Sequence, residues 1–123
     1  EDDWGEKWQG LLETYPENNP DEDEPVVTTN YDNQANQLLA ANLEGKLLLA
    51  HGMLDTNVHP SSTLLVVDAL IEADKDFDLV VLPNASHGFG NRRYFMKRRW
   101  DYFVGNLRGL QPPSEFIFAD NVR

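Results

Sequence analysis

Residues 45–52, "GKLLLAHG", form a short apolar run between two glycines. A run of this length between turn-forming residues is typical of a strand that is buried on both faces. Residues 76–84, "DFDLVVLPN", show the same pattern, and Pro83 is expected to end this second strand because proline cannot donate a hydrogen bond to a sheet. These two segments decide the fold class, since helical patterns alternate with them along the rest of the chain.

Two helices are predicted from the spacing of the apolar residues. Residues 59–74, "HPSSTLLVVDALIEAD", place a proline near a helix start and favour an apolar face made of Leu64, Val67 and Ile71. Residues 90–109, "GNRRYFMKRRWDYFVGNLRG", favour a second apolar stripe, whose members are Met96, Trp100, Phe103 and Leu107. The predicted order is therefore strand, helix, strand, helix.

This order predicts an α/β fold. Alternating strands and helices indicate a parallel sheet that is covered by helices and joined by a right-handed crossover. Two strands cannot form such a sheet alone, because each strand needs ladder partners and both faces need cover. Further strands are therefore expected N-terminal to residue 1, and the 123 residues correspond to one domain at most or to a part of one.

The sequence divides into three parts by composition. Residues 1–44 are predicted to be an acidic, proline-rich arm with short helices, residues 45–115 the strand and helix unit, and residues 116–123 a tail. The net charge of −11 is concentrated at the start, where Glu1 to Glu24 contain ten acidic residues and one lysine. This composition favours a solvated arm over an acidic partner-binding tail.

Two short helices are expected in the arm, with loop between them. The first is predicted from apolar residues at helical spacing, which are Trp4, Trp8, Leu11 and Leu12. The second is predicted in residues 33–43, "NQANQLLAANL", and should end near the following "EGK".

Charge and composition also argue against several classes of function. The acidic balance disfavours nucleic acid, and the basic stretch "NRRYFMKRRW" (residues 91–100) is better explained as the solvated face of a helix. The absence of cysteine excludes disulfides, thiolate zinc sites and cysteine nucleophiles. No apolar run approaches the roughly 18 residues that span a bilayer, and no signal-like segment opens the chain. Periplasmic, secreted and cytoplasmic locations all stay open.

The stretch "HGMLDTNVHP" (residues 51–60) is rich in polar side chains. His51, Asp55 and His59 are spaced at i, i+4 and i+8, which would align three metal ligands on a helix. The strand before this stretch and the proline at its end indicate a loop instead. We therefore expect no metal here, and nothing in the sequence implies an organic cofactor.

The predicted topology brings Asp55 close to a histidine. Asp55 follows the first strand, and His87, in "NASHGFG" (residues 84–90), follows the second. Parallel neighbouring strands carry both loops to the same edge of the sheet, roughly 5–10 Å apart. An aspartate that accepts a hydrogen bond from a histidine there is the orienting half of a serine-hydrolase triad.

The nucleophile of such a triad is missing from the sequence. α/β-Hydrolases run in the order Ser, Asp, His, and their serine lies in a GxSxG turn. No GxSxG occurs here, and the serines all follow Asp55 and lack flanking glycines, at positions 61, 62, 86 and 114. The chain thus carries an aspartate and histidine pair without its serine.

Three stretches resemble one family: "LLLAHGMLDTNVHP", "FDLVVLPNASHGFG" and "KRRWDYFVGNLRG". They resemble the C-terminal end of the catalytic domain of the prolyl oligopeptidase family, particularly its dipeptidyl peptidase IV-like branch, over roughly residues 1–115. The resemblance implies the C-terminal portion of an α/β-hydrolase fold. The family pattern HGxxDDNVH places its catalytic aspartate on Asp55 and has Thr56 in place of the second aspartate, and the terminal HG motif places the catalytic histidine on His87.

The resemblance also implies substrate-binding residues and partners. Asn57 falls on the asparagine that holds the P2 carbonyl of a peptide, and Val58 on a residue that lines the S1 pocket. Residues 2–10, "DDWGEKWQG", resemble an aromatic wall of that pocket, which makes Trp4 an S1 candidate. The implied activity is cleavage of peptides after proline or alanine, with the serine, the oxyanion hole and a β-propeller supplied by the upstream portion of the protein.

Two alternatives to a dipeptidyl peptidase stay open. One is a non-catalytic pseudopeptidase or assembly fragment, with the last helix as the face of a possible homodimer. The other is an esterase or acylaminoacyl peptidase with the same fold. In either case, the 123 residues alone are expected to hydrolyse nothing.

Overall fold

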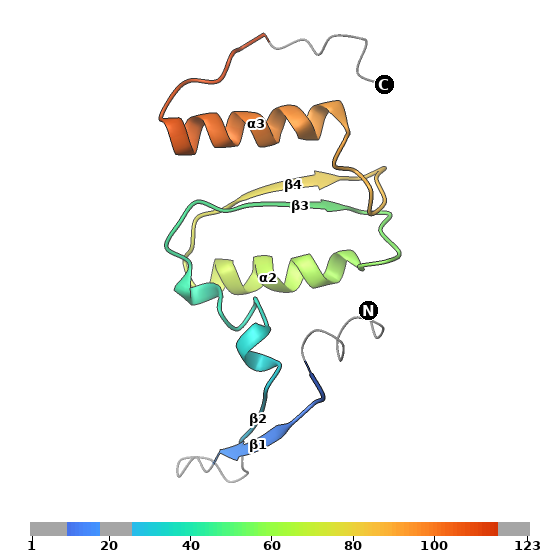
Figure 1. Cartoon of the computed structure of the whole chain (residues 1–123), viewed down its shortest axis with the longest axis vertical. Helices are drawn as coiled ribbons and strands as arrows, with labels where there is room; N and C mark the ends of the chain where they lie inside the picture. Colours follow the sequence, from blue (N-terminus) through green and yellow to red (C-terminus); the bar gives the residue numbers. More distant parts are fainter. Residues whose placement is uncertain (1–9, 18–25, 116–123) are drawn as a thin grey trace. The chain divides into compact units, whose positions relative to one another are not determined.

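The computed structural model describes residues 10–17 and 26–115 (Figure 1). In chain order the elements are β1 (Thr14–Glu17), β2 (Val26–Thr29), the 3-10 helices η1 (Asp32–Gln34) and η2 (Ala40–Asn42), β3 (Leu48–Gly52), α2 (Pro60–Glu72), β4 (Asp78–Leu82) and α3 (Arg93–Arg108). They belong to two compact units, the first made of residues 1–44 and 64–75 and the second of residues 45–63 and 76–123. The second unit contains both strands predicted first.

The second unit is built on a parallel pair of strands. β3 and β4 pair in a register that sets Leu48 opposite Asp78 and Gly52 opposite Leu82. Pro83 follows the last residue of β4, as the sequence predicted. The two parallel strands, with a helix between them along the chain, confirm the α/β class.

The core of the second unit lies on one face of this sheet. Its buried residues are Val80, Leu82 and Ala85, and the partly buried residues packed on them are Leu48, Ala50, Phe89 and Phe95. The rings of the two phenylalanines meet edge to face, with centroids 5.1 Å apart. This contact joins α3 to the loop that follows β4.

The other face of β4 is open, which corrects one expectation. Alternate residues of a strand point to opposite faces of the sheet. Leu79 and Val81, which alternate with the core residues, are 37% and 45% exposed. The prediction that this strand is buried on both faces is therefore wrong for the described chain, because the packed apolar cluster covers only one face.

The helix α3 ends in a glycine cap. Gly109 adopts the left-handed conformation with φ of 61°, and its N–H donates to the carbonyl of Gly105. The bond from Gly109 to Gly105 is that of a left-handed glycine cap, and the N–H of Leu110 donates to the carbonyl of Val104 at 3.4 Å. None of the described helices is long and apolar enough to cross a membrane.

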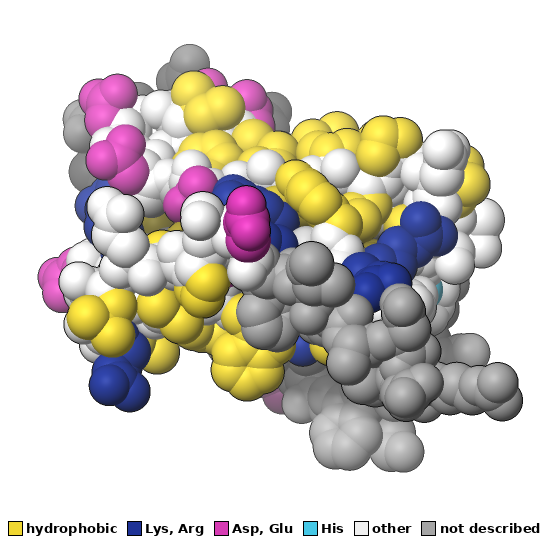
Figure 2. All heavy atoms as spheres, turned by 90° about the horizontal axis from the view of Figure 1, so that it is seen from above, with side chains coloured by type: hydrophobic (Ala, Val, Ile, Leu, Met, Phe, Trp, Pro, Cys, Tyr) yellow, Lys and Arg dark blue, Asp and Glu magenta, His cyan; other side chains and the backbone are white. Residues whose placement is uncertain are grey.

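The predicted apolar stripe of α3 does not face the core. Trp100, Phe103 and Leu107 are 58%, 47% and 75% exposed, whereas Phe95 packs on the core cluster. The surface on the α3 side of the molecule accordingly shows apolar side chains among lysines and arginines (Figure 2). The helix carries apolar residues on more than one side, so their spacing alone did not reveal which side is covered.

The same error affects α2. Leu64 and Ile71 of the predicted face are 49% and 60% exposed, and the buried residues of the helix are Pro60 and Leu70, the latter 1% exposed. Nearly every position from 64 to 71 is apolar. The spacing of apolar and polar residues therefore does not distinguish one face of the helix from another. The helix itself begins at Pro60, as expected.

The first unit departs most from the sequence prediction. β1 and β2 form an antiparallel pair where loop was expected, with Thr14 opposite Thr29. No helix includes residues 10–13, and the helix expected over residues 33–43 is replaced by the two short 3-10 helices. The Asn30 side chain holds the start of this pair, accepting from the N–H of Glu13 and donating to the carbonyl of Leu11.

Gly52, the last residue of β3, lies against the loop that follows β4. A Cβ atom at this position would lie 2.5 Å from the carbonyl oxygen of Ala85 and 2.6 Å from that of Ser86. Both are backbone atoms, so no side chain can turn away to relieve the contact. Only glycine permits this approach of the two loops.

Gly52→Ala is therefore expected to destabilise the fold by about 1–3 kcal/mol, the cost typical of overpacking. Chemical denaturation of the chain followed by circular dichroism measures this change. Gly45→Ala is the matched control, because a Cβ there would meet nothing within 4 Å. Equal stability of the two variants would contradict the close approach.

Candidate active site

The two loops at the carboxyl ends of β3 and β4 are joined by backbone hydrogen bonds. The N–H of Met53 donates to the carbonyl of Leu82 at 3.0 Å, and that of Leu54 donates to Ala85 at 2.9 Å. Ala85 is fully buried, and Gly52 lies beside it. The loops that carry Asp55 and His87 are thus fixed against each other.

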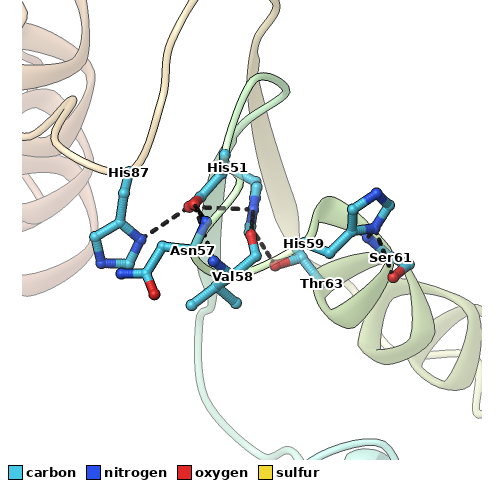
Figure 3. A network of polar contacts seen from close by, with 8 residues as sticks. His51, Asn57, Val58, His59, Ser61, Thr63 and His87 are labelled. Atoms are coloured by element: carbon cyan, nitrogen blue, oxygen red, sulfur yellow. Dashed lines mark hydrogen bonds and ion pairs between the residues drawn. The ribbon is translucent and has the colours of Figure 1, made fainter. Parts of the chain in front are cut away.

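Asp55 and His87 are hydrogen-bonded. Nδ1 of His87 lies 2.9 Å from Oδ2 of Asp55 (Figure 3). A carboxylate only accepts, so Nδ1 carries the proton and Nε2 keeps its lone pair. The carboxylate is 3% exposed and the imidazole 59% exposed. A buried anion therefore orients an accessible base.

The other carboxylate oxygen of Asp55 is held by the backbone. Oδ1 accepts from the N–H groups of Asn57 and Val58, both at 2.9 Å. Burial opposes ionisation, but the hydrogen bonds from Val58, His87 and Asn57 outweigh it and hold the pKa of Asp55 below its ordinary value of 3.8. Asp55 is therefore a carboxylate at neutral pH.

The side chains of the two predicted substrate residues lie beside this pair. Asn57 is exposed and Val58 half-buried. In Figure 3 the Asn57 amide points to the side on which the His87 ring lies, away from Thr63. Trp4, the third predicted substrate residue, lies outside the described residues.

The other two histidines of the motif have separate partners. Nδ1 of His51 lies 2.7 Å from the hydroxyl of Thr63, and its Nε2 lies 3.0 Å from the carbonyl of Val58. Nδ1 of His59 lies 2.9 Å from the hydroxyl of Ser61. Both rings are therefore bonded to the start of α2, and that of His51 is also bonded to the loop. Across residues 10–17 and 26–115, no group of three histidine or acidic side chains is placed to hold a metal.

Some contacts of the site were missed by the sequence predictions. The Arg92 guanidinium donates to the carbonyl of Asn84 at 2.7 Å and thereby ties the start of α3 to the histidine loop. No local pattern signals this contact. The turn closed by Asp55 could have been predicted, because aspartate side chains commonly accept from N–H groups two and three residues later.

Comparison with known proteins agrees with this architecture. Residues 2–109 match the sequence profile of the prolyl oligopeptidase family. Dipeptidyl peptidase family member 1 of Caenorhabditis elegans is 37% identical over 59 residues, which are 48% of this chain and 7% of that protein.

Two solved structures are similar to the chain. Dipeptidyl peptidase 4 of Porphyromonas gingivalis matches with a TM-score of 0.53 and 30% identity, over 57% of this chain and 10% of that one. Acylaminoacyl peptidase of Pyrococcus horikoshii has a TM-score of 0.58 and 23% identity, over 72% and 15% of the two chains, and this likeness concerns the fold alone.

The chain spans less than a tenth of the curated relative, while the family match covers most of the chain itself. Together with the parallel strands and intervening helix, the match confirms a portion of an α/β-hydrolase domain. The chain belongs to the prolyl oligopeptidase family and corresponds to the C-terminal catalytic region of its dipeptidyl peptidase IV-like members.

Proposed function

We propose that this chain supplies the aspartate and the histidine of a serine peptidase that cleaves peptides after proline or alanine. The observation that carries the proposal is the 2.9 Å hydrogen bond from His87 to the buried carboxylate of Asp55. It fixes the tautomer that leaves Nε2 of His87 basic and exposed. The serine, the oxyanion hole and a β-propeller belong to the upstream portion of the intact protein.

The proposed chemistry follows from this tautomer. Nε2 of His87 takes the proton of the serine hydroxyl as its oxygen attacks the scissile carbonyl, and the ring becomes an imidazolium. Asp55 stabilises that cation through the Nδ1–H hydrogen bond. Nε2 then gives the proton to the leaving amine, which breaks the peptide bond and leaves an acyl-serine for water to hydrolyse. His87 ends the cycle neutral.

Substrate placement falls to the neighbouring residues. Asn57 donates its amide N–H to a substrate carbonyl without introducing a charge, which suits a neutral peptide. Val58 and Trp4 line the pocket for a proline or alanine side chain, where burial of apolar area favours binding. These assignments rest on the family resemblance and, for Asn57, on its place beside His87.

The 123-residue chain is expected to cleave no proline-dipeptide nitroanilide, since it has no nucleophile. In the intact protein, His87→Ala should lower kcat about 10⁶-fold because it removes the base, and Asp55→Asn should lower it about 10⁴-fold because it disturbs the tautomer. Labelling with a fluorophosphonate probe should weaken in parallel.

His59→Ala is the matched control for this experiment, because His59 is exposed and its side chain bonds only to Ser61 among the described residues. It should retain full activity. The proposal fails if His87→Ala keeps normal activity, or if the 123-residue chain alone cleaves the substrate.

Asp55 should also make stability depend on pH. A carboxylate whose native pKa lies below its unfolded pKa stabilises the fold fully above the unfolded value, and this contribution is lost as pH falls through the native value. Below about pH 3.8 the stability of the chain should therefore drop more steeply than that of Asp55→Asn. Denaturant midpoints measured at several pH values test this, and parallel profiles for the two proteins would contradict it.

A further inference from the structure

His51 is a buried titratable residue that the proposed chemistry does not use. Its side chain is 11% exposed, and the residue lies at the end of β3, beside the turn closed by Asp55. Both ring nitrogens have partners, the carbonyl of Val58 on one side and the hydroxyl of Thr63 on the other. The ring thus joins the end of the strand, the turn and the first helical turn of α2.

These partners determine where the ring carries its proton. The carbonyl of Val58 only accepts, so Nε2 of His51 must donate. In a neutral ring Nδ1 is then an acceptor, and the Thr63 hydroxyl donates to it. This tautomer is the opposite of the one that Asp55 imposes on His87.

The contacts hold both backbone polar groups of Val58. Its N–H donates to Oδ1 of Asp55 at 2.9 Å, and the Val58 carbonyl accepts from Nε2 of His51 at 3.0 Å. The same Nε2 lies 3.7 Å from Oδ2 of Asp55, beyond hydrogen-bond distance. His51 therefore acts on Asp55 through the peptide it fixes.

We propose that His51, whose ring is held in place by Thr63, is a positioning residue for Asp55 and for the substrate-binding turn at Asn57 and Val58. The proposal rests on the proposed function for its catalytic consequence. The contacts from Asp55 and His51 to the two backbone groups of Val58 form a clamp on that residue. Without the contact from His51 the backbone dihedrals of Val58 are free to change, which weakens the N–H donor to Asp55 and lets the carboxylate move away from His87. A displacement of about 1 Å in a catalytic group can cost about 10²-fold in rate.

Two substitutions of His51 test this role. In His51→Gln the side-chain N–H₂ reaches the place of Nε2 and can still donate to the Val58 carbonyl. In His51→Asn the shorter side chain reaches only the place of Nδ1, so the clamp is lost. Both variants lose the aromatic ring, but Asn is also one methylene smaller than Gln. The Thr63 variants and the hydrogen exchange at Val58 described below are therefore the readouts that a packing role of His51 would not move.

In the intact protein, His51→Gln should keep kcat within about threefold of the unaltered protein, and His51→Asn should lower it about 10²-fold. Thr63→Val should show a smaller loss than His51→Asn, and Thr63→Ser, which keeps the hydroxyl, should restore activity. Equal kcat values for His51→Gln and His51→Asn would overturn the proposal.

A second measurement, also on the intact protein, keeps the two proposals apart. Amide hydrogen exchange at Val58, followed by NMR, should be at least tenfold faster in His51→Asn than in His51→Gln, and ¹⁵N shifts of the His51 ring should show Nε2 protonated. If the unaltered intact protein hydrolyses nothing, the proposed function fails. The ratio of exchange rates at Val58 still tests whether His51 fixes the backbone of Val58. Equal exchange rates, or a proton on Nδ1 alone, would overturn it.

Discussion

The parallel pairing of β3 with β4 is the constraint on which the site depends. The register sets Gly52 opposite Leu82, so both strands end at the same level and their loops leave the sheet together. Backbone hydrogen bonds then join the loops, and the missing side chain at Gly52 lets them approach. The distance between the reactive side chains is thus set by main-chain contacts, which side-chain motion cannot relax.

The polar side chains held by these loops differ in burial. Asp55 gives up its contact with water but receives N–H donors on both oxygens, so its charge is retained. His51 is buried as well, and its ring is satisfied by one acceptor and one hydroxyl. His87 alone among these three keeps a large exposed surface. Two rings in one site therefore hold opposite tautomers because their partners differ.

The sequence predicted the parts of this arrangement that depend on local patterns and on topology. The apolar runs at 45–52 and 76–84 identified the strands, and the rule for parallel strands brought Asp55 near His87. Periodicity did not identify the buried faces of α2 and α3. Both helices carry apolar residues on more than one side, and which side is buried depends on the elements that pack against the helix. The contact of His51 with Thr63 joins residues twelve positions apart through a turn whose shape no local pattern reports.

The unpaired edges of the sheet have a consequence for handling the chain. Within the described residues β3 and β4 pair only with each other, so each presents one row of unpaired N–H and C=O groups, and Leu79 and Val81 are exposed next to one of these rows. Unpaired strand edges beside apolar side chains are templates for the addition of another strand. In a test tube the isolated polypeptide therefore tends to add strands from its own copies, and low protein concentration will favour monodisperse samples.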